Sequence, residues 1–280
     1  MKKILITGVN SYVGNSFAEW IKDYPNDYSV DKISVRGDDW KEADFSVYDT
    51  VLHVAGIAHR KETNKNKNIY YRVNRDLTYK IAEKAKNEGV KQFIFLSTMS
   101  VYGLNTGVID ENTPLKPNNS YGESKLQAEK LLQGLDDSFF KITIIRPPMI
   151  YGKGCKGNYR RLKYLALKTP VFPNIKNKRS MIYIDNLSIF IKKIIDNFNN
   201  GVYRPQNKEY VNTSDMVQKI ANIHGKKIKF IKIFNPLINN FNLRILNKVF
   251  GNLVYEKDEQ KNADCDNFID FNLSIKLTEE

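Results

Sequence analysis

Two side chains that could move a proton together stand four residues apart in the stretch SYGESKLQAEK, residues 120–130. Tyr121 and Lys125 would lie on the same face of a helix about one turn apart, so the phenol and the ammonium could converge on one point. A phenol has a pKa of about 10, and a neighbouring positive charge favours its ionised form. The spacing therefore indicates an acid–base pair, although two solvated surface residues would give the same pattern.

A glycine turn follows the first apolar stretch of the chain. KKILITG, residues 2–8, predicts a buried strand, and GNSFAEWIKDY, residues 14–24, has the apolar spacing of a helix. In a strand, glycine turn and helix, the turn backbone approaches a pyrophosphate whose charge is held at the helix N-terminus. Ser11 stands at the middle position of the glycine pattern. The cofactor-binding residues predicted in this turn are Gly8, Asn10, Ser11, Tyr12, Val13 and Gly14.

A basic residue follows about twenty residues later, where the second strand of such a unit meets the adenosine ribose. The stretch KISVRGDDW predicts a strand that ends on Arg36. A guanidinium there pairs with a 2′-phosphate, so we expect NADP(H) as the preferred cofactor and NAD(H) as the alternative, with Asp38 or Asp39 still able to reach the ribose. The short stretch from Val30 to Val51 leaves little room for another strand, and a looser grip on adenosine would suit cofactor exchange.

Strands and helices then alternate along the first half. TVLHVAGIAH, residues 50–59, predicts a strand that ends in Ala55 and Gly56, small residues that let a cofactor lie against the strand end, with His53 as a packed strand residue. Residues 70–90 predict a helix that stops at Gly89, and VKQFIFLSTMSVYG, residues 90–103, predicts another strand and loop. The alternation predicts an α/β fold with a doubly wound parallel sheet, whose ligands bind at the carboxyl ends of its strands.

Composition narrows the classes of partner. The 280 residues carry a net charge of +13, which favours anionic partners, but no zinc-finger, RNA-binding or basic-zipper pattern accompanies it, so we expect no nucleic acid. The chain has no stretch of about 18 apolar residues, so we expect no membrane span. Cys155 and Cys265 form neither a metal pattern nor a disulfide framework, so we expect no metal and a cytoplasmic location.

Seven motifs in series resemble the extended short-chain dehydrogenase/reductase family, in its NAD-dependent epimerase/dehydratase branch that acts on nucleotide sugars. They are TGVNSYVG, HVAG, YYRVN, FLSTMSVYG, SYGESK, RPPMIYGKG and RSMIYIDNL, between residues 7 and 187. The resemblance implies a Rossmann-like fold with a smaller C-terminal substrate-binding lobe, and a catalytic set of Thr98, Tyr121 and Lys125. It also implies Asn74, with Tyr121 and Lys125, at the cofactor, and Thr98, Ser100 and Arg179 at the substrate, with Arg179 gripping a nucleotide diphosphate. Met149 departs from the family, which often has a polar residue after the RP pair, and Asn158 is the residue expected to supply the missing substrate contact, with a solvated surface asparagine as the alternative.

The resemblance also bears on the reaction. Family members that remove water carry an Asp-Glu pair directly after the threonine, where this chain has Met99 and Ser100, so a 4,6-dehydratase is not expected. Because Arg36 favours NADPH, we expect reduction of a UDP-linked 4-keto-6-deoxy-N-acetylhexosamine in surface polysaccharide synthesis. A UDP-hexose or UDP-N-acetylhexosamine 4-epimerase with retained NAD is the alternative, and a non-catalytic nucleotide-sensing regulator is a third reading.

The second half is less regular. We predict a dinucleotide-binding domain over residues 1–152 and 179–208, and a substrate-binding lobe over 153–178 and 209–280. KITIIRPPMIYG, residues 141–152, predicts one strand, and residues 153–173 a loop into the lobe. Residues 235–255 have helical spacing that suits packing in the lobe, the face of a homodimer or adhesion to a membrane surface, with packing the prediction. Residues 256–268 predict a polar loop.

Overall fold

The computed structural model describes residues 1–58, 62–63, 67–232, 247, 249–257 and 267–280, which form two compact units. The first, called here the sheet unit, comprises residues 1–103, 114–147 and 188–205. The second, called the C-terminal unit, comprises residues 104–113, 148–187 and 206–280. The domains predicted from the sequence change after residues 152, 178 and 208, and they keep residues 104–113 with the dinucleotide-binding domain.

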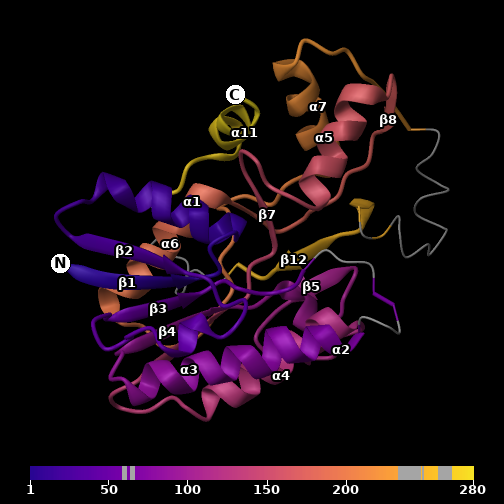
Figure 1. The fold of residues 1–280 in the computed structure, drawn as a ribbon. Helices are drawn as coiled ribbons and strands as arrows, with labels where there is room; N and C mark the ends of the chain where they lie inside the picture. The colour runs from indigo at the N-terminus through magenta and orange to yellow at the C-terminus, as the bar shows by residue number, and fades with distance from the viewer. Residues whose placement is uncertain (59–61, 64–66, 233–246, 248, 258–266) are drawn as a thin grey trace. The chain divides into compact units, whose positions relative to one another are not determined.

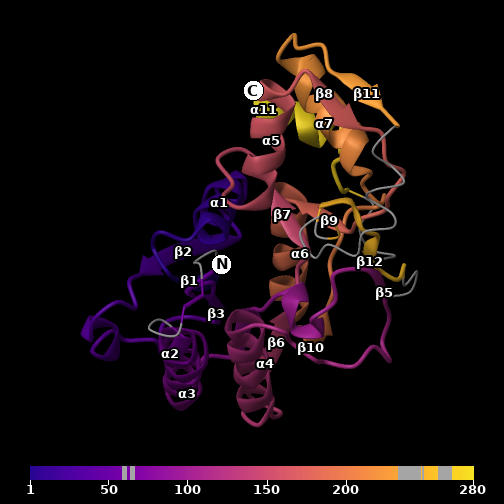
Figure 2. The ribbon, with the colours of Figure 1, turned by 90° about the vertical axis from the view of Figure 1, so that its right-hand side faces the viewer.

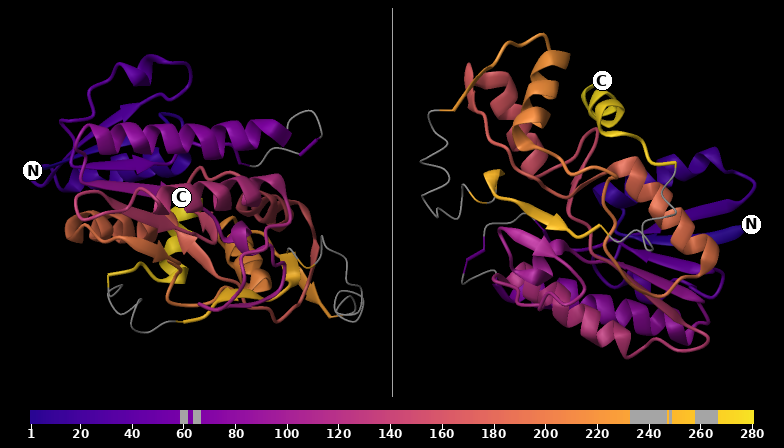
Figure 3. Two further views of the ribbon diagram at one scale, coloured as in Figure 1. Left: turned by 90° about the horizontal axis from the view of Figure 1, so that it is seen from below. Right: turned by 180° about the vertical axis from the view of Figure 1, so that it is seen from behind.

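The sheet unit is built on six parallel strands in the order β10-β6-β4-β3-β1-β2. Helices lie on both faces, α1 and α6 on one and α3 and α4 on the other (Figures 1 and 3). This confirms the predicted doubly wound parallel sheet. Its elements are β1 (Lys2–Thr7), α1 (Tyr12–Trp20), β2 (Tyr28–Ile33), β3 (Thr50–His53), α2 (Lys67–Tyr70), α3 (Thr78–Asn87), β4 (Gln92–Leu96), α4 (Ser120–Gln133), β6 (Lys141–Ile145), α6 (Ile184–Asn197, which starts in the other unit) and β10 (Gly201–Tyr203).

Alternation along the strands explains why both faces are covered. Successive side chains of a strand point to opposite faces. Leu5 of β1 belongs to one hydrophobic cluster with Ile81 of α3 and Leu132 of α4, and all three are buried. Its neighbour Ile6 points the other way and packs against Gly14 of α1. Parallel strands buried on both faces read as continuous apolar runs, which is why the sequence identified them.

The edge of the sheet differs from the predicted strand. β2 begins at Tyr28 and ends at Ile33, so Arg36 lies three residues beyond the strand and not at its last position. Ile33 pairs with Thr7 of β1, and the polar residues Asp31 and Lys32 within β2 interrupt its apolar pattern, so the predicted strand was placed too late in the chain. Between β2 and β3 the chain forms only a short 3-10 turn, Asp39–Lys41, so β2 is the edge and no further strand intervenes, as the spacing predicted.

The predicted helix over residues 70–90 is interrupted. It consists of α2, a π-helical segment at Tyr71–Leu77 and α3, followed by Gly89 with a φ of +80°. Single π-helical turns inside α-helices occur frequently at functional sites. Asn74 lies within this segment and is fully buried.

In the part of the chain that the structure describes, the C-terminal unit contains the helices α5, α7 and α11 and short pairs of parallel strands. The helices α5, α7 and α11 pack together through contacts of α7 with the other two (Figure 2). The carboxylate of Glu279 in α11 accepts hydrogen bonds from Tyr159 and His224 and pairs with Lys163, at 2.6, 2.6 and 2.7 Å. Its elements are β5 (Gly107–Ile109), β7 (Met149–Tyr151), α5 (Asn158–Lys168), β8 (Val171–Pro173), β9 (Met181–Tyr183), α7 (Thr213–Ile223), β11 (Lys229–Ile231), β12 (Leu253–Tyr255) and α11 (Phe271–Glu279).

Two predictions for this half were wrong. The expected strand over residues 141–152 is split into β6 and β7, which join different sheets on either side of Pro147 and Pro148. The expected loop over residues 153–173 contains α5 and β8. Residues 235–246, 248 and 258–266 of the last two predicted segments lie outside the described residues. Within the described part of the chain, no helix is long and apolar enough to cross a membrane.

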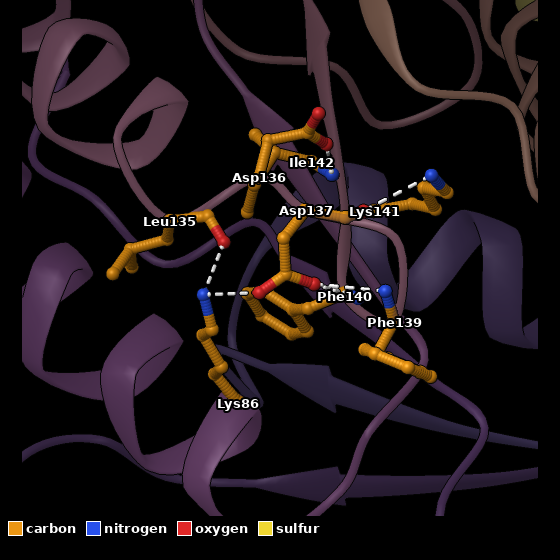
Figure 4. Close-up of polar contacts among 8 residues, drawn as sticks. All are labelled: Lys86, Leu135, Asp136, Asp137, Phe139, Phe140, Lys141 and Ile142. Carbon is orange, nitrogen blue, oxygen red and sulfur yellow. Dashed lines mark hydrogen bonds and ion pairs between the residues drawn. The ribbon is translucent and has the colours of Figure 1, made fainter.

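Two neighbouring carboxylates hold the turn that returns the chain from α4 to β6: Asp136 accepts from the N–H of Ile142 at 2.7 Å, and Asp137 makes the larger set of contacts (Figure 4). Asp137 accepts hydrogen bonds of 2.8 Å from the backbone N–H groups of Phe139 and Phe140 and forms an ion pair of 2.7 Å with Lys86 of α3. Lys86 also donates to the carbonyl of Leu135 at 2.7 Å. The hydrogen bond from Lys86, followed by those from the two amides, lowers the pKa of Asp137 from 3.8 to about 2.

We expect Asp137→Asn to lower the midpoint of thermal unfolding at pH 7, because the amide cannot pair with Lys86. The native carboxyl has a pKa below its ordinary 3.8, so its stabilising effect is present above that pH and is lost as the pH falls through about 2. Thermal melts from pH 7 to pH 2 should show the two proteins converging. Asp27→Asn, at an exposed position, is the control; an equal effect of both changes would contradict the assignment.

Candidate active site

Tyr121 and Lys125 lie in the first turns of α4, whose start is held by two side chains. Asn119 caps the helix by accepting a 2.8 Å hydrogen bond from the N–H of Gly122. Glu62, from the segment after β3, accepts from the N–H and the hydroxyl of Ser120, both at 2.9 Å. These contacts satisfy backbone donors that a helix start leaves without intrahelical partners. They also fix the residue next to Tyr121.

Thr98 meets Tyr121 from the end of β4. Its backbone is extended, and Thr98 is the N-cap of a 3-10 turn at Met99–Tyr102. Its hydroxyl accepts a 3.2 Å hydrogen bond from the N–H of Ser100 in that turn. The Thr98 hydroxyl also lies near enough to the Tyr121 phenol to lower its pKa. On the other side the Tyr121 ring meets the Tyr70 ring edge to face, with centroids 6.4 Å apart. The structure thus brings together Thr98 and Tyr121, two of the three residues that the resemblance assigns to catalysis.

Burial controls the charge on Tyr121. Removal of the ring from water raises the pKa of Tyr121, and the hydrogen bond from Thr98 opposes this rise while Tyr70 adds to it. The phenol is therefore protonated near neutral pH when only the chain's own groups act on it. A protonated phenol beside a hydroxyl can donate a proton, and the same phenol can recover one.

Lys125 is almost completely buried, with 4% of its surface exposed. Its ammonium donates a 2.8 Å hydrogen bond to the carbonyl of Leu96 and lies 4.4 Å from the centre of the Phe95 ring. Burial lowers the pKa of Lys125 to about 7, and the negative charge of Glu129 opposes this effect. The amine is therefore poised to be charged or neutral in the working pH range.

A buried ion pair beneath these residues was not predicted from the sequence. Glu129, one turn after Lys125 in α4, binds the guanidinium of Arg146 with N–O distances of 2.6 to 3.2 Å. The same carboxylate accepts a hydrogen bond from Ser97, and Arg146 donates to the hydroxyl of Tyr102 at 2.9 Å. Only the i, i+4 spacing of Lys125 and Glu129 could have pointed to it.

The glycine turn fits a dinucleotide phosphate. Gly8 has a φ of +97°, and a Cβ there would lie 3.0 Å from the backbone of Ala55, so the turn requires glycine. Ser11, which stands where the pattern expected glycine, is the N-cap of α1 and accepts from the N–H of Gly14 at 3.3 Å. The first turn of α1 carries no acidic residue. A capped helix start without a competing carboxylate suits an anion.

The other predicted residues of the turn differ in exposure. Asn10 is exposed, Tyr12 is half-buried in the first turn of α1, and Val13 is buried. Gly14 is buried against Ile6 of β1 and Val54. Of the residues predicted in this turn, Asn10 is the one whose side chain is exposed.

Asn74 holds the loop after β3, and both atoms of its side-chain amide are engaged in hydrogen bonds. Its Oδ1 accepts from the N–H of Ile57 at 2.8 Å, and its Nδ2 donates to the Ile57 carbonyl at 3.1 Å and to Ser124 Oγ at 3.2 Å. Ala55 and Gly56 lie in the same loop, and a Cβ on Gly56 would stand 3.1 Å from Asn74 and 3.4 Å from Lys125. The loop therefore passes close to the acid–base pair.

His53 is a packed strand residue, as predicted. Its ring is completely buried, Nδ1 is 2.7 Å from the hydroxyl of Thr7, and Nε2 is 3.0 Å from that of Thr78. Thr78 donates its own proton to the carbonyl of Asn74, so Nε2 is the protonated nitrogen and Nδ1 accepts from Thr7. Burial, and then the charge of Lys125, lowers the pKa of His53 to about 3, which keeps it neutral.

Arg36 is exposed beyond the carboxyl end of β2, and its N–H donates to Ser34 Oγ at 3.3 Å. Asp38, one of the acidic alternatives, is 2.7 Å from Lys41, and Asp39 is exposed. Gly8 donates to the carbonyl of Ile33, so the start of this segment lies next to the glycine turn. A cofactor held at the turn could be reached by Arg36.

The remaining predicted residues for the substrate belong partly to the C-terminal unit. Ser100 is half-buried, with its hydroxyl 3.3 Å from that of Thr98. Asn158 is exposed at the first residue of α5. Arg179 donates to the carbonyl of Gly251 at 2.9 Å, and burial lowers its pKa to about 10. In the part of the chain that the structure describes, the guanidinium of Arg179 contacts backbone carbonyls and pairs with no carboxylate.

Gly122 generates a test of this geometry, because a Cβ there would lie 2.6 Å from the carbonyl oxygen of Ser100. We expect Gly122→Ala to push the turn after Thr98 away from α4 and to lower turnover by roughly 10-fold or more, since small misplacements of catalytic groups cost up to about 10²-fold. Steady-state kinetics will measure the loss.

The matched control is Gly134→Ala at the other end of α4, where a new Cβ meets only the carbonyl of Leu131 at 3.4 Å. It should leave turnover nearly unchanged. Equal rates for Gly122→Ala and the wild type would contradict the close approach.

Comparison with known proteins identifies the family. Residues 4–207 match the family described as the NAD dependent epimerase/dehydratase family. An N-acetyl-α-D-glucosaminyl-diphospho-ditrans,octacis-undecaprenol 4-epimerase of Escherichia coli O157:H7 is 33% identical over 270 residues, with 89% of this chain and 81% of the relative covered. A UDP-glucose 4-epimerase of Vibrio cholerae is 33% identical over 251 residues, with 79% and 75% covered.

A solved structure shows the same fold. UDP-glucuronic acid 4-epimerase from Bacillus cereus, in complex with NAD, superposes with a TM-score of 0.77 at 20% identity and covers 99% of this chain and 97% of its own. The parallel sheet, the glycine turn and the grouping of Thr98, Tyr121 and Lys125 agree with the sequence match over residues 4–207. The chain therefore belongs to the NAD-dependent epimerase/dehydratase family of extended short-chain dehydrogenases/reductases.

Proposed function

We propose that the chain is a 4-epimerase that inverts C4 of a diphosphate-linked hexose or N-acetylhexosamine. The grouping of Thr98, Tyr121 and Lys125 at the carboxyl end of β4 carries this proposal. It gains support from the two relatives at 33% identity, both of which are named 4-epimerases. This reaction was the alternative reading of the sequence, and the relatives move it ahead of the reductase.

The residues divide the work as follows. A nicotinamide cofactor, held by the glycine turn from Gly8 to Gly14, would accept and return the hydride. Tyr121 takes the proton from O4 as C4 is oxidised and returns it as C4 is reduced from the opposite face. Thr98, whose hydroxyl lowers the pKa of Tyr121, would orient the same oxygen. Lys125, buried beside Leu96, supports the ionised phenol when its amine is charged.

Epimerisation uses one acid–base group twice. The proton and the hydride that leave in the first half-reaction both return in the second, so the reaction requires no net acid or reductant. One tyrosine meets this need because it starts and ends each cycle ionised. Burial raises the pKa of Tyr121 in the chain alone, so the positive charges of Lys125 and of an oxidised nicotinamide would have to favour its phenolate. Met99 and Ser100 supply no further acid and base, so elimination of water is not proposed.

Arg179 would bind the diphosphate of the substrate. Its guanidinium is largely desolvated, and burial alone accounts for its lowered pKa. An anion would offset that desolvation, and a guanidinium offers two parallel donors to a phosphate. Asn158 and Ser100 would supply polar contacts to the same substrate.

A second candidate is the reduction of a UDP-linked 4-keto-6-deoxy-N-acetylhexosamine with NADPH in surface polysaccharide synthesis. The observation that favours it is Arg36, an exposed guanidinium beyond β2. A reductase consumes one reduced cofactor per turnover, so it must exchange that cofactor. An epimerase retains it.

One experiment separates the candidates. Purified protein is assayed for epimerisation of UDP-glucose, UDP-N-acetylglucosamine and diphospholipid-linked N-acetylglucosamine, and for NADPH oxidation with the 4-keto sugar. Inversion at C4 with NAD retained through gel filtration would support the epimerase, and NADPH oxidation alone would support the reductase. Cofactor binding without turnover on any substrate would support a nucleotide-sensing regulator and contradict both enzymes.

We expect Tyr121→Phe to lower turnover by about 10²–10⁴-fold, the usual range for losing a general acid or base. The ring and its edge-to-face contact with Tyr70 remain, so the affinity for the cofactor should change little. Turnover is measured by substrate conversion and affinity by titration. A variant that keeps more than about a tenth of the wild-type rate is incompatible with the assigned role.

Arg36→Ala should separate the two cofactors. If the guanidinium meets a 2′-phosphate, its loss removes a charge-assisted hydrogen bond of about 1.5–3 kcal/mol and weakens NADPH binding by roughly 10- to 150-fold, with little effect on NADH. Titrating wild type, Arg36→Ala and Lys41→Ala with both cofactors measures this. Equal wild-type affinities for NADPH and NADH would exclude the NADP preference and remove the argument for the reductase.

A further inference from the structure

The excess positive charge of the chain is concentrated in one segment. Residues 138–184 contain eleven of the 44 basic residues and no acidic one, so the remaining 33 basic residues nearly balance the 31 acidic ones. Nine of the eleven lie in the stretch 148–187 of the C-terminal unit. A local excess of this size creates a positive potential over the surface that carries it.

Helix α5 presents this charge on one face. Tyr159, Leu162 and Ala166 are buried, three and four residues apart, and form the packed face of the helix. The exposed positions repeat with the same period on the other side. We define the α5 basic face as the exposed residues Arg160, Arg161, Tyr164 and Lys168 of the helix, with Lys153 and Lys156 of the preceding loop.

The cations of this face are available. Lys163, on the border of the face, is engaged with Glu279 and helps to fix the helix against α11. Within the ranges that the structure describes, none of the five basic residues of the α5 basic face forms an ion pair. Five uncompensated cations on a helix held in place by Glu279 make a preformed surface for an anionic partner.

We propose that the α5 basic face docks the protein on a membrane surface that contains anionic phospholipids. Tyr164, 63% exposed in the middle of the face, has an apolar ring and a polar hydroxyl, which suit the boundary between headgroups and acyl chains. Val171, three residues after the helix, is 42% exposed, and an aliphatic side chain gains by entering lipid but gains nothing from a nucleic acid backbone. These two residues favour lipid over nucleic acid.

This proposal says where the protein acts, and it does not depend on which reaction the protein catalyses. The Escherichia coli relative is named for a sugar joined through a diphosphate to undecaprenol, which is a lipid. An enzyme that acts on a substrate of that chemistry must meet it at a membrane, whereas a substrate linked to UDP requires no such surface. Docking through α5 is therefore compatible with either substrate and is tested without turnover.

Flotation with vesicles tests the docking. The full chain is mixed with vesicles of phosphatidylcholine alone, or with 30% phosphatidylglycerol, at 0.1 M and 0.5 M salt. We expect binding to the anionic vesicles at low salt and no binding to neutral vesicles. At high salt the protein should be released, because the Debye length, about 10 Å at 0.1 M, becomes shorter and the attraction between the charges is screened. Absence of binding to anionic vesicles at 0.1 M salt would overturn the proposal.

Charge reversal locates the surface. Each basic residue near an anionic surface contributes about a factor of five, so Arg160→Glu with Arg161→Glu and Lys168→Glu should weaken vesicle binding by at least on the order of 100-fold. The control combines Lys80→Glu, Lys116→Glu and Lys130→Glu, three exposed positions of the sheet unit with the same change in net charge. It should weaken binding much less; equal losses would mean that net charge alone attracts the protein and would overturn the proposal.

Two further measurements complete the test. Circular dichroism must show that both triple variants are folded, and if the α5 variant is not, Tyr164→Ser replaces it, with a several-fold loss expected. Turnover on a water-soluble UDP-sugar should be the same for the α5 variant and the wild type. Tighter binding to a short DNA or RNA duplex than to anionic vesicles would assign the face to nucleic acid instead and reject the membrane.

Discussion

The buried ion pair between Glu129 and Arg146 is the interaction on which the geometry of the site depends. Removing one partner of such a pair costs about 3–5 kcal/mol because the other is left buried and unpaired. Glu129 is 1% exposed, and its carboxylate also accepts from Ser97, the residue before Thr98. The pair therefore ties α4 to the carboxyl ends of β4 and β6. Thr98 and Lys125 take their positions from that junction.

The same pair explains the charge state of Lys125. An isolated Glu129 one turn away would hold the amine strongly protonated, but Arg146 already neutralises that carboxylate with two-pronged contacts. Burial then dominates and lowers the pKa of Lys125 to about 7. Burial also raises the pKa of Tyr121. The protein alone thus keeps the Tyr121 phenol protonated and leaves the Lys125 amine close to its titration point, and a positive charge near the phenol is what would draw the proton from Tyr121.

The spacing of residues in the sequence predicted features that depend on local structure, whereas features that depend on tertiary contacts were missed. Tyr121 and Lys125 were found because i and i+4 positions share a helix face, and the apolar strands because they are buried on both sides. Glu129 and Arg146 are 17 residues apart and meet because the chain turns back after α4 and brings β6 against that helix, a contact to which only the i, i+4 spacing of Lys125 and Glu129 could have pointed. α5 was missed because the glycines before it and its basic residues obscured the regular burial of Tyr159, Leu162 and Ala166.

The edge of the sheet bears on how firmly a cofactor could be held. The short stretch between β2 and β3 leaves no further strand, and this suggested a loose grip on adenosine. The stretch is nevertheless anchored: Trp40 and Phe45 are buried in the hydrophobic cluster beneath α3, and the N–H of Phe45 donates to Glu88 at 2.6 Å. Each buried aromatic ring contributes about 1.5–3 kcal/mol, enough to hold the segment after Arg36 in one place. A missing strand is therefore compatible with a firmly held cofactor, as a 4-epimerase requires.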